Sequence, residues 1–468
     1  MNRPWELNIE FTKTDRKAVY VQIADAIIIA IKSKRLKAYE ILPSTRKLAS
    51  MIGVNRNTLL KALDILMIEG WLISKDRVGI FVADVKVDVA VTKEKTNQQT
   101  SSDKPQVILL DDGVPNTQIA PIKELASAYR RGFGLKFKRN ILGYTDSRGS
   151  VAFREMIAQM LNHKRGLQVG ASEICITRGS QMALYLTAQC LLTNKDCIIV
   201  EAPGYQPAWK VFEHTGAQVL SAKVDEQGII IEEVKELLQV HKNIKAIYVT
   251  PHHQYPTTVT LTLQRRLELI ELAKAHNFFI IEDDYDHEFH FDSRPILPIA
   301  SYTTIEHYVY IGTFSKIVAP ALRIGYLVGA TNLIEKISAL RAIIDIQNDP
   351  IMEQAVVELI KNGDIKRHIK RAIKYYKDKR LYLQQLLEEH LKDKIEYNLP
   401  SGGLAFWMRP TQKKITLDLL AKLKAQQIEI MDVSKYNPDC VVNGLRLGYG
   451  SVEKESLKKA IEVLSTLL

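Results

Sequence analysis

The feature of this 468-residue chain that most constrains its fold is a set of apolar segments that alternate with helical stretches. The segments are CIIVEAP, IKAIYVTP, FFIIEDDYD and HYVYIGTFSK, all between residues 197 and 316, and each contains a largely apolar, strand-like run. One of the stretches between them, LQRRLELIELAKAHN, repeats its apolar residues at helical spacing. This alternation predicts an α/β domain around a largely parallel sheet.

The front of the chain has a different pattern. Helical spacing recurs in Val19 to Lys32, Ser44 to Ile52 and Asn55 to Ile68, and WLISKDRVGIFVAD then alternates as a small two-stranded wing does. A polar run rich in Thr, Gln, Ser and Lys follows, which is typical of a flexible connector. We therefore expect a small α+β domain at 1–84, a flexible linker at 85–107 and the α/β domain at 108–468.

Charge is concentrated in the front domain. Residues 1–84 hold 14 lysines and arginines against nine aspartates and glutamates, in a chain whose net charge is +11. Such an excess favours a polyanionic partner.

Cysteine spacing and hydropathy exclude two other classes. The four cysteines form no CxxC pair and no Cys/His cluster with zinc spacing, so we expect neither a disulfide framework nor a metal site. No apolar run reaches the roughly 18 to 20 residues that span a bilayer, and the opening MNRPWELNIE lacks the features of a secretory signal. We expect a cytoplasmic protein with no membrane partner.

Residues at the starts of two front helices suit DNA. Asn55 can cap a helix whose first turn holds Arg56, Asn57 and Thr58, where side chains face base edges when the helix lies in a major groove. The supporting helix begins with Ser44, Arg46 and Lys47, which can hold a phosphate. Each pattern alone is better explained by helix caps and a solvated basic face.

The complete block is more specific. LPSTRKLA, GVNRNTLLKAL, MIEGWL and GIFV resemble the winged helix-turn-helix of the GntR family. The resemblance implies that Ser44, Arg46, Arg56 and Thr58 contact double-stranded DNA. Lys34 and Tyr39 stand where the family often has glycine, which should be tolerable, whereas Arg77 replaces the first glycine of the wing and leaves the geometry of its turn open.

A second group of residues suits pyridoxal 5′-phosphate, which needs a lysine for a Schiff base, a carboxylate for its pyridine nitrogen and a phosphate pocket. Asp283, which lies between the acids Glu282 and Asp284, ends one strand-like run, and its choice over Asp284 rests more on a family resemblance than on the pattern. Lys316 lies in GTFSK after another such run. Two strand ends of one sheet can bring both to one crevice. The surrounding candidates are Thr313, Ser315 and Arg323, the helix start Gly179, Ser180 and Gln181, and the stacking residue Tyr205. Singly, each is more simply a loop, turn or core residue.

The order of these motifs resembles the fold-type I aminotransferases from about Val107 onward, and more narrowly the aminotransferase-like half of the MocR/GabR regulators. The motifs are YTDSRGSVAFREMIA, TRGSQMALYLTA, EAPGYQPA, TPHHQYP, IIEDDYDHEF and GTFSKIVAPALRIGY. The resemblance implies a Schiff base at Lys316, a bond from Asp283 to the pyridine nitrogen and from Tyr285 to the ring hydroxyl, phosphate at Arg323, and a homodimer. Arg446, in GLRLGYG, matches the arginine that binds the carboxylate of an amino-acid effector.

Two departures affect the function. Tyr255 replaces the asparagine that aminotransferases usually place at the ring hydroxyl, which favours a regulator, and Thr258 replaces the usual glycine. We therefore expect a pyridoxal phosphate-dependent transcriptional regulator that senses an amino compound and carries out little full transamination. A working aminotransferase with an attached DNA-binding domain is the alternative. The effector, the operator and the direction of regulation stay open.

Overall fold

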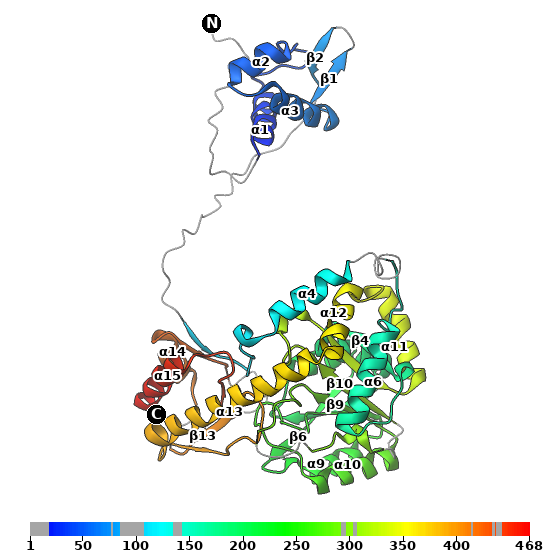
Figure 1. Ribbon diagram of the computed structural model, residues 1–468, viewed down its shortest axis with the longest axis vertical. Coiled ribbons are helices and arrows are strands. Elements are labelled where there is room, and N and C mark those ends of the chain that lie inside the picture. The colour runs from blue at the N-terminus through cyan, green and yellow to red at the C-terminus, as the bar shows by residue number, and fades with distance from the viewer. Residues whose placement is uncertain are drawn as a thin grey trace. The chain divides into compact units, whose positions relative to one another are not determined.

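The computed structural model describes residues 18–75, 78–84, 107–133, 143–291, 296–302, 307–412, 415–432, 436 and 442–468. Contacts between Cα atoms divide the chain into two units, Met1–Ser102 and Asp103–Leu468 (Figure 1). Among the described residues, no helix is long and apolar enough to cross a membrane.

The first unit is a three-helix domain with a two-stranded wing. Helix α3 packs on α1 and α2 around buried Ile27, Leu48 and Leu63. Gly53 ends α2 with a φ of 76°, which the turn between the helices requires and which glycine adopts without strain. The elements are α1 (Val19–Lys32), α2 (Thr45–Ile52), α3 (Arg56–Ile68) and the antiparallel β1 (Leu72–Lys75) and β2 (Gly79–Val82).

The two substituted glycine positions of this unit keep a left-handed backbone. Lys34 has a φ of 58° and Tyr39 a φ of 66°, a region that side chains other than glycine occupy at a cost. The Tyr39 hydroxyl donates a 3.3 Å hydrogen bond to Asp84, which helps hold that residue. Arg77 lies outside the described residues.

An eight-stranded sheet forms the centre of the second unit and is largely parallel, as predicted. Strands β10, β9, β8, β5 and β6 run parallel to one another, whereas β11, β4 and β7 each pair antiparallel with their neighbours. In sheet order the strands are β4 (Ile174–Thr177), β11 (Gly325–Gly329), β10 (Tyr308–Thr313), β9 (Phe279–Asp284), β8 (Ile244–Val249), β5 (Cys197–Ala202), β6 (Gln218–Asp225) and β7 (Gly228–Ile229).

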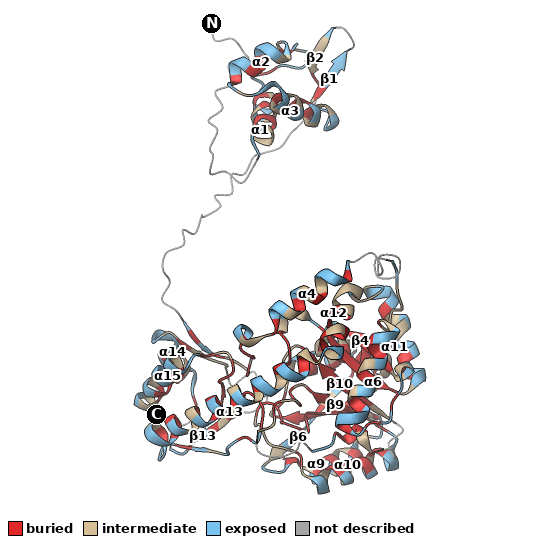
Figure 2. Ribbon diagram, viewed as in Figure 1, coloured by how far each residue is buried: buried red, intermediate tan, exposed pale blue. Residues whose placement is uncertain are grey.

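Helices cover both faces of this sheet, so its strands are buried (Figure 2). Cores form on either side, one with Ile198 and Leu327 and another with Ile199 and Ile280. The helices are α6 (Val151–Arg165), α7 (Ser180–Leu191), α8 (Gln206–Glu213), α9 (Ile231–Val240), α10 (Leu263–His276), α11 (Thr331–Ile344) and α12 (Pro350–Lys361), with α4 (Ile122–Gly132) packed on α12.

The remaining elements form a smaller α+β layer that the 28-residue helix α13 (Asp364–Leu391) joins to the sheet (Figure 1). Strand β3 (Ile108–Leu110), the first described strand of this unit, pairs parallel with β14 (Ile428–Ile430). The start of the unit is thereby tied to its C-terminal part. The other elements are the antiparallel β12 (Ile395–Tyr397), β13 (Ala405–Pro410) and β15 (Leu445–Gly448), and the helices α14 (Leu417–Ala425) and α15 (Lys454–Leu467).

Candidate functional site

A cavity of about 220 Å³ lies at the carboxyl ends of the parallel strands, where open α/β sheets bind ligands. Its wall combines aromatic rings with ionisable groups and hydroxyls. The lining residues are Asp112, Val114, Ser180, Tyr205, Tyr248, Thr250, Tyr255, Asp283, Tyr285, Thr313, Ser315, Lys316 and Arg323.

Lys316 follows β10 and turns its amine into this cavity. The Nζ atom donates a 2.6 Å hydrogen bond to the carbonyl oxygen of Gly113 and lies 5.3 Å from the centre of the Tyr285 ring. Burial lowers the pKa of the lysine. The amine is thus brought closer to the neutral form in which it acts as a nucleophile.

Asp283 reaches the cavity from the neighbouring strand. It is buried, and its Oδ2 atom accepts a 3.0 Å hydrogen bond from the hydroxyl of Tyr248, whereas Oδ1 has no partner among the described residues. Burial raises the pKa of Asp283 to about 7, although the Tyr248 hydroxyl opposes that rise. A buried carboxylate oxygen without a partner is costly unless a ligand with a donor or positive charge meets it.

The side of the cavity around α7 is built for an anion. Gly179 precedes α7 with a φ of 82°, and a Cβ atom there would lie 2.7 Å from the guanidinium of Arg323, so a larger residue would push the arginine away from the helix start. The Thr313 hydroxyl accepts from the amide of Ser315 at 3.1 Å, and the buried Ser315 hydroxyl has no described partner. A helix N-terminus, the unpartnered Ser315 hydroxyl and a guanidinium together fit a phosphate.

Aromatic rings and a buried arginine close the opposite side. Tyr205 meets Tyr255 edge to face with ring centres 5.2 Å apart, and the Tyr255 hydroxyl donates a 2.7 Å hydrogen bond to Asp112. The Arg446 guanidinium, from β15, lies 4.9 Å from the centre of the Tyr255 ring and donates to the carbonyl oxygen of Pro256 at 2.8 Å. Arg446 is 2% exposed and so is not a surface arginine.

The structure does not place every predicted residue on the cavity wall. Gly179 and Gln181 flank the lining residue Ser180, and the Gln181 side chain donates to the carbonyl oxygen of Pro207. Arg446 lies behind the ring of Tyr255. The other predicted cofactor residues line the cavity.

Three residues at the cavity carry no sequence motif. Tyr248 is one apolar residue of a buried strand, and its hydrogen bond to Asp283 depends on the register of β8 against β9. Asp112 and Gly113 follow β3 and bond to residues more than 140 positions away, which are Tyr255 and Lys316. Only their position directly after the linker could have drawn attention to them.

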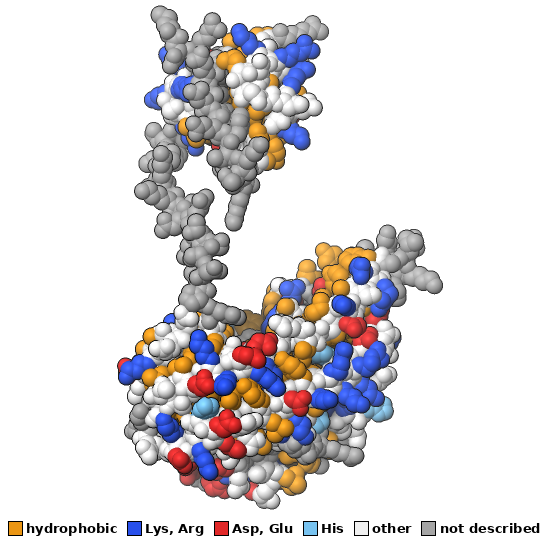
Figure 3. Space-filling model, turned by 60° about the vertical axis from the view of Figure 1, so that its left-hand side comes forward, with side chains coloured by type: hydrophobic (Ala, Val, Ile, Leu, Met, Phe, Trp, Pro, Cys, Tyr) orange, Lys and Arg blue, Asp and Glu red, His pale blue; other side chains and the backbone are white. Residues whose placement is uncertain are grey.

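The predicted DNA-contacting residues lie at the first turns of α2 and α3. Ser44, Arg46, Lys47, Arg56 and Asn57 are exposed, and Thr58 is half-buried. The Asn55 side chain caps α3 by accepting from the amide of Asn57 at 2.9 Å. Lysine and arginine side chains are visible on this unit in Figure 3.

Thr258 takes over the backbone of the glycine it replaces, since its φ is 63°. Its amide donates a 2.7 Å hydrogen bond to the carbonyl oxygen of Gln254. A short turn therefore holds a β-branched residue in the left-handed region, where such residues are rare.

Both units match families of known proteins. Residues 105–464 match the model of aminotransferase class I and II, and residues 19–82 match that of the bacterial regulatory proteins of the gntR family. The HTH-type transcriptional regulator YdeL of Bacillus subtilis is 28% identical over 90% of this chain and 91% of its own length. The probable rhizopine catabolism regulatory protein MocR of Rhizobium meliloti is 24% identical over 95% and 92%.

The second unit also resembles solved aminotransferases. The kynurenine aminotransferase of Pyrococcus horikoshii, solved in complex with PMP, is 27% identical with a TM-score of 0.72, over 77% of this chain and 90% of that one. The chain therefore belongs to the aminotransferase class I and II family and, with its gntR-family DNA-binding domain in front, is a transcriptional regulator of the MocR type.

Proposed function

We propose that this regulator binds pyridoxal 5′-phosphate in the cavity and uses it to sense an amino compound. The observation that carries the proposal is that the Lys316 amine and the unpartnered Oδ1 of Asp283 lie in one cavity, beside an anion-binding helix start. Pyridoxal phosphate, when bound, supplies an aldehyde that condenses reversibly with amines. Few other ligands need an amine, a buried carboxylate and a phosphate pocket together.

The residues divide between the parts of the cofactor. Lys316 is the amine that bonds the aldehyde, Asp283 holds the proton of the pyridine nitrogen, and Tyr205 lies against the ring. Tyr285 lines the same cavity and would meet the ring hydroxyl. Its own hydroxyl donates to the carbonyl oxygen of His253 at 2.8 Å. The phosphate is assigned to the residues around α7, which are Gly179, Ser180, Gln181, Thr313, Ser315 and Arg323.

The effector is a small amino compound with a carboxylate. Arg446 is buried beside the cavity, and its Nε atom has no partner among the described residues. A guanidinium with a free donor binds a carboxylate in a planar, two-point geometry. An effector that reaches Arg446 would also compete with the carbonyl oxygens of Pro256 and Asp112 that the arginine now holds.

The first unit binds the operator DNA, so it converts effector binding in the second unit into a change in regulation. Ser44, Arg46 and Lys47 are positioned for phosphates, and Arg56, Asn57 and Thr58 for base edges. Solved relatives of this fold are generally paired enzymes, so we propose a homodimer in which two such units read two half-sites. A DNA-binding regulator acts on the chromosome, so we propose that the protein is cytoplasmic.

The decisive experiment follows the cofactor and the DNA in the same sample. Visible absorbance of the protein loaded with pyridoxal phosphate, compared with Lys316→Ala, reports the bond at the lysine, and fluorescence anisotropy of labelled promoter DNA reports binding. An amine that changes both signals in the wild type, and neither in Lys316→Ala, supports the sensor. An amine that changes the spectrum while DNA affinity stays constant would overturn it.

A working aminotransferase remains the second candidate, because Lys316, Asp283 and Arg323 are all retained at the cavity. Tyr255 separates the two functions, since it takes the place of an asparagine in the aminotransferase pattern. Repeated turnover of an amino donor and a keto acid, measured by product formation, would make the protein an enzyme first. A single spectral change without keto acid release favours the regulator.

A further inference from the structure

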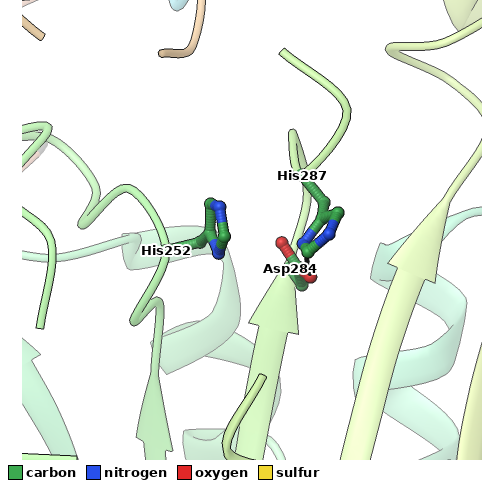
Figure 4. Close-up of side chains that lie close together, drawn as sticks. All are labelled: His252, Asp284 and His287. Atoms are coloured by element: carbon green, nitrogen blue, oxygen red, sulfur yellow. Dashed lines mark ion pairs between the residues drawn. The ribbon is translucent and has the colours of Figure 1, made fainter. Parts of the chain in front are cut away.

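Two histidines and an aspartate meet on the face of β9 that points away from the cavity. His252 follows β8, Asp284 ends β9 and His287 lies three residues further on (Figure 4). One ligand atom from each lies within 4.8 Å of the others, and all three residues are less than 7% exposed. Because successive residues of a strand point to opposite faces, Asp284 turns away from the cavity that Asp283 lines.

The cluster contains polar atoms that the protein leaves unsatisfied. Asp284 Oδ1 and His287 Nδ1 are buried without a hydrogen-bond partner among the described residues. His287 Nδ1 is 2.8 Å from Asp284 Oδ2, within ion-pair distance of the carboxylate when the ring is protonated but outside regular hydrogen-bond geometry. Two ligands that each stand about 2.1 Å from a common metal ion are about 2.9 to 3.4 Å apart, so a modest rearrangement would let both reach one ion.

Neighbouring side chains fix the Asp284 carboxylate by a hydrogen bond and by charge, as the residues around a metal site fix a metal-bound carboxylate. Its Oδ2 atom accepts a 2.6 Å hydrogen bond from the Tyr310 hydroxyl and lies 3.6 Å from Arg165. The Arg165 guanidinium is itself paired with Glu288, so its charge is already opposed by a second carboxylate. The buried Arg266 also acts on Asp284 and on Glu282, so three carboxylates face two guanidiniums around the cluster. This leaves a negative charge for a cation when all three are ionised, and fixed carboxylates are typical of metal sites.

We propose that His252, Asp284 and His287 bind one divalent transition metal ion, with zinc as the best fit. Imidazole nitrogens favour zinc over magnesium or calcium, and three protein ligands leave one position of a tetrahedral ion for water. The ion joins the segment after β8 to the end of β9. Both segments also deliver cavity residues, Tyr255 and Tyr285, so metal binding stiffens the wall of the cavity without entering it.

The proposal is independent of the cofactor and is tested on the full chain without an affinity tag. Equilibrium dialysis against micromolar zinc, followed by metal analysis, measures the number of ions per chain. Wild type is expected to bind one zinc ion per chain and to melt at a higher temperature with zinc than with a chelator. His252→Ala and His287→Ala are expected to lose more than about tenfold in affinity, since even outer-shell partners of a metal contribute about 10- to 100-fold.

His276→Ala is the matched control, because His276 is an exposed histidine at the end of α10. It should bind zinc as the wild type does. If the alanine variants do not fold, the visible spectrum of cobalt-loaded wild type decides alone, because nitrogen and oxygen ligands in a four-coordinate site give an intense band that hydrated cobalt lacks. Failure of wild type to bind zinc stoichiometrically, or equal binding by a folded His252→Ala/His287→Ala double variant, would overturn the proposal.

Discussion

The Nζ atom of Lys316 donates a 2.6 Å hydrogen bond to the carbonyl oxygen of Gly113, a residue 203 positions earlier in the chain. The turn that carries Gly113 begins directly after β3 and is held by Asp111, whose Oδ1 atom accepts from the amides of Gly113 and Val114 at 2.8 and 2.7 Å. Any ligand that takes the lysine amine removes one of the bonds that fix this turn. The start of the second unit is therefore coupled to the state of the lysine.

Lys316→Ala should loosen that turn. A hydrogen bond is worth about 1 kcal/mol net, so the amides of Gly113 and Val114 should exchange with solvent about fivefold faster, measured by hydrogen exchange with mass spectrometry. Lys242→Ala is a matched control, because the Lys242 amine also donates to a backbone carbonyl, that of Leu238 in α9, at 3.3 Å. Unchanged exchange at Gly113 and Val114 in Lys316→Ala would show that the turn does not depend on the lysine.

Tyr248→Phe should make the stability of the cofactor-free protein more sensitive to pH. The pKa of Asp283 is about 7, above its usual range, so its carboxyl favours folding when protonated and loses that contribution as pH rises through 7. Without the Tyr248 hydroxyl the pKa rises further, by about one unit, because a hydrogen bond to a charged group is worth about 1.5 kcal/mol or more.

Wild type and Tyr248→Phe should therefore differ by about 1 kcal/mol more at pH 8 than at pH 5, measured as the free energy of unfolding in urea. The same comparison in an Asp283→Asn background is the control, since no carboxyl titrates there. A difference that is equal at both pH values in the Asp283 background would contradict the assignment.

Gly179→Ala should cost about 2 to 3 kcal/mol of stability and weaken pyridoxal phosphate binding. At a φ of 82° and a ψ of 174°, Gly179 lies in a backbone region that almost only glycine occupies, and a new Cβ would also push aside the Arg323 guanidinium 2.7 Å away. Gly166, at a φ of 68° and a ψ of 14°, lies in the left-handed helical region and has no contact closer than 3.5 Å, so Gly166→Ala should cost only about 1 kcal/mol. Urea unfolding measures both losses, and cofactor titration should show weaker binding for Gly179→Ala alone; equal binding by the two variants would argue against a role of Gly179 in the phosphate site.

Thr258→Gly should stabilise the second unit by about 1 kcal/mol, because it relieves a left-handed β-branched residue. Thr257→Gly, next to it, should destabilise, since the Thr257 hydroxyl and amide both donate to the side-chain oxygen of Gln254. The melting temperature should therefore rise in Thr258→Gly and fall in Thr257→Gly. If Thr258→Gly melts lower than wild type, the threonine contributes contacts that outweigh its strain.

Arg46→Ala should weaken DNA binding on every sequence and lower the slope of log affinity against log salt by about 1, as the loss of one phosphate contact does. Arg56→Ala should instead reduce the preference for the operator over unrelated DNA. Anisotropy titrations at several salt concentrations measure both effects. Lys37→Ala, an exposed lysine outside the two helix starts, serves as control, and an equal change in its slope would count against the assignment of Arg46.

The sequence predicted most of the elements because their signals are local. The three front helices end within a residue of the predicted bounds, and their breaks coincide with caps such as Asn55 and Gly53. Lys316 and Asp283 each follow a strand-like run, and strand ends of a parallel sheet meet at one edge. These local patterns and the shared sheet edge were enough to predict that Lys316 and Asp283 lie in one cavity.

The remaining site residues depend on distant pairing. Asp112 reaches Tyr255 only because β3 pairs with β14, and neither strand is longer than three residues. His252 and His287 belong to segments that meet because β8 and β9 are neighbours, and their spacing in the chain resembles no zinc motif. Such contacts are set by topology, and no window of sequence contains both partners.

The three consecutive acids of β9 leave this strand little freedom to change length. Glu282 accepts from the amides of Ile299 and Ala300, Asp283 faces the cavity, and Asp284 holds the histidine cluster on the other face. A single inserted or deleted residue would send each carboxylate to the opposite face, although the letters EDD would still read the same. We expect homologues to vary freely in the loops on either side of this strand and to keep its length fixed.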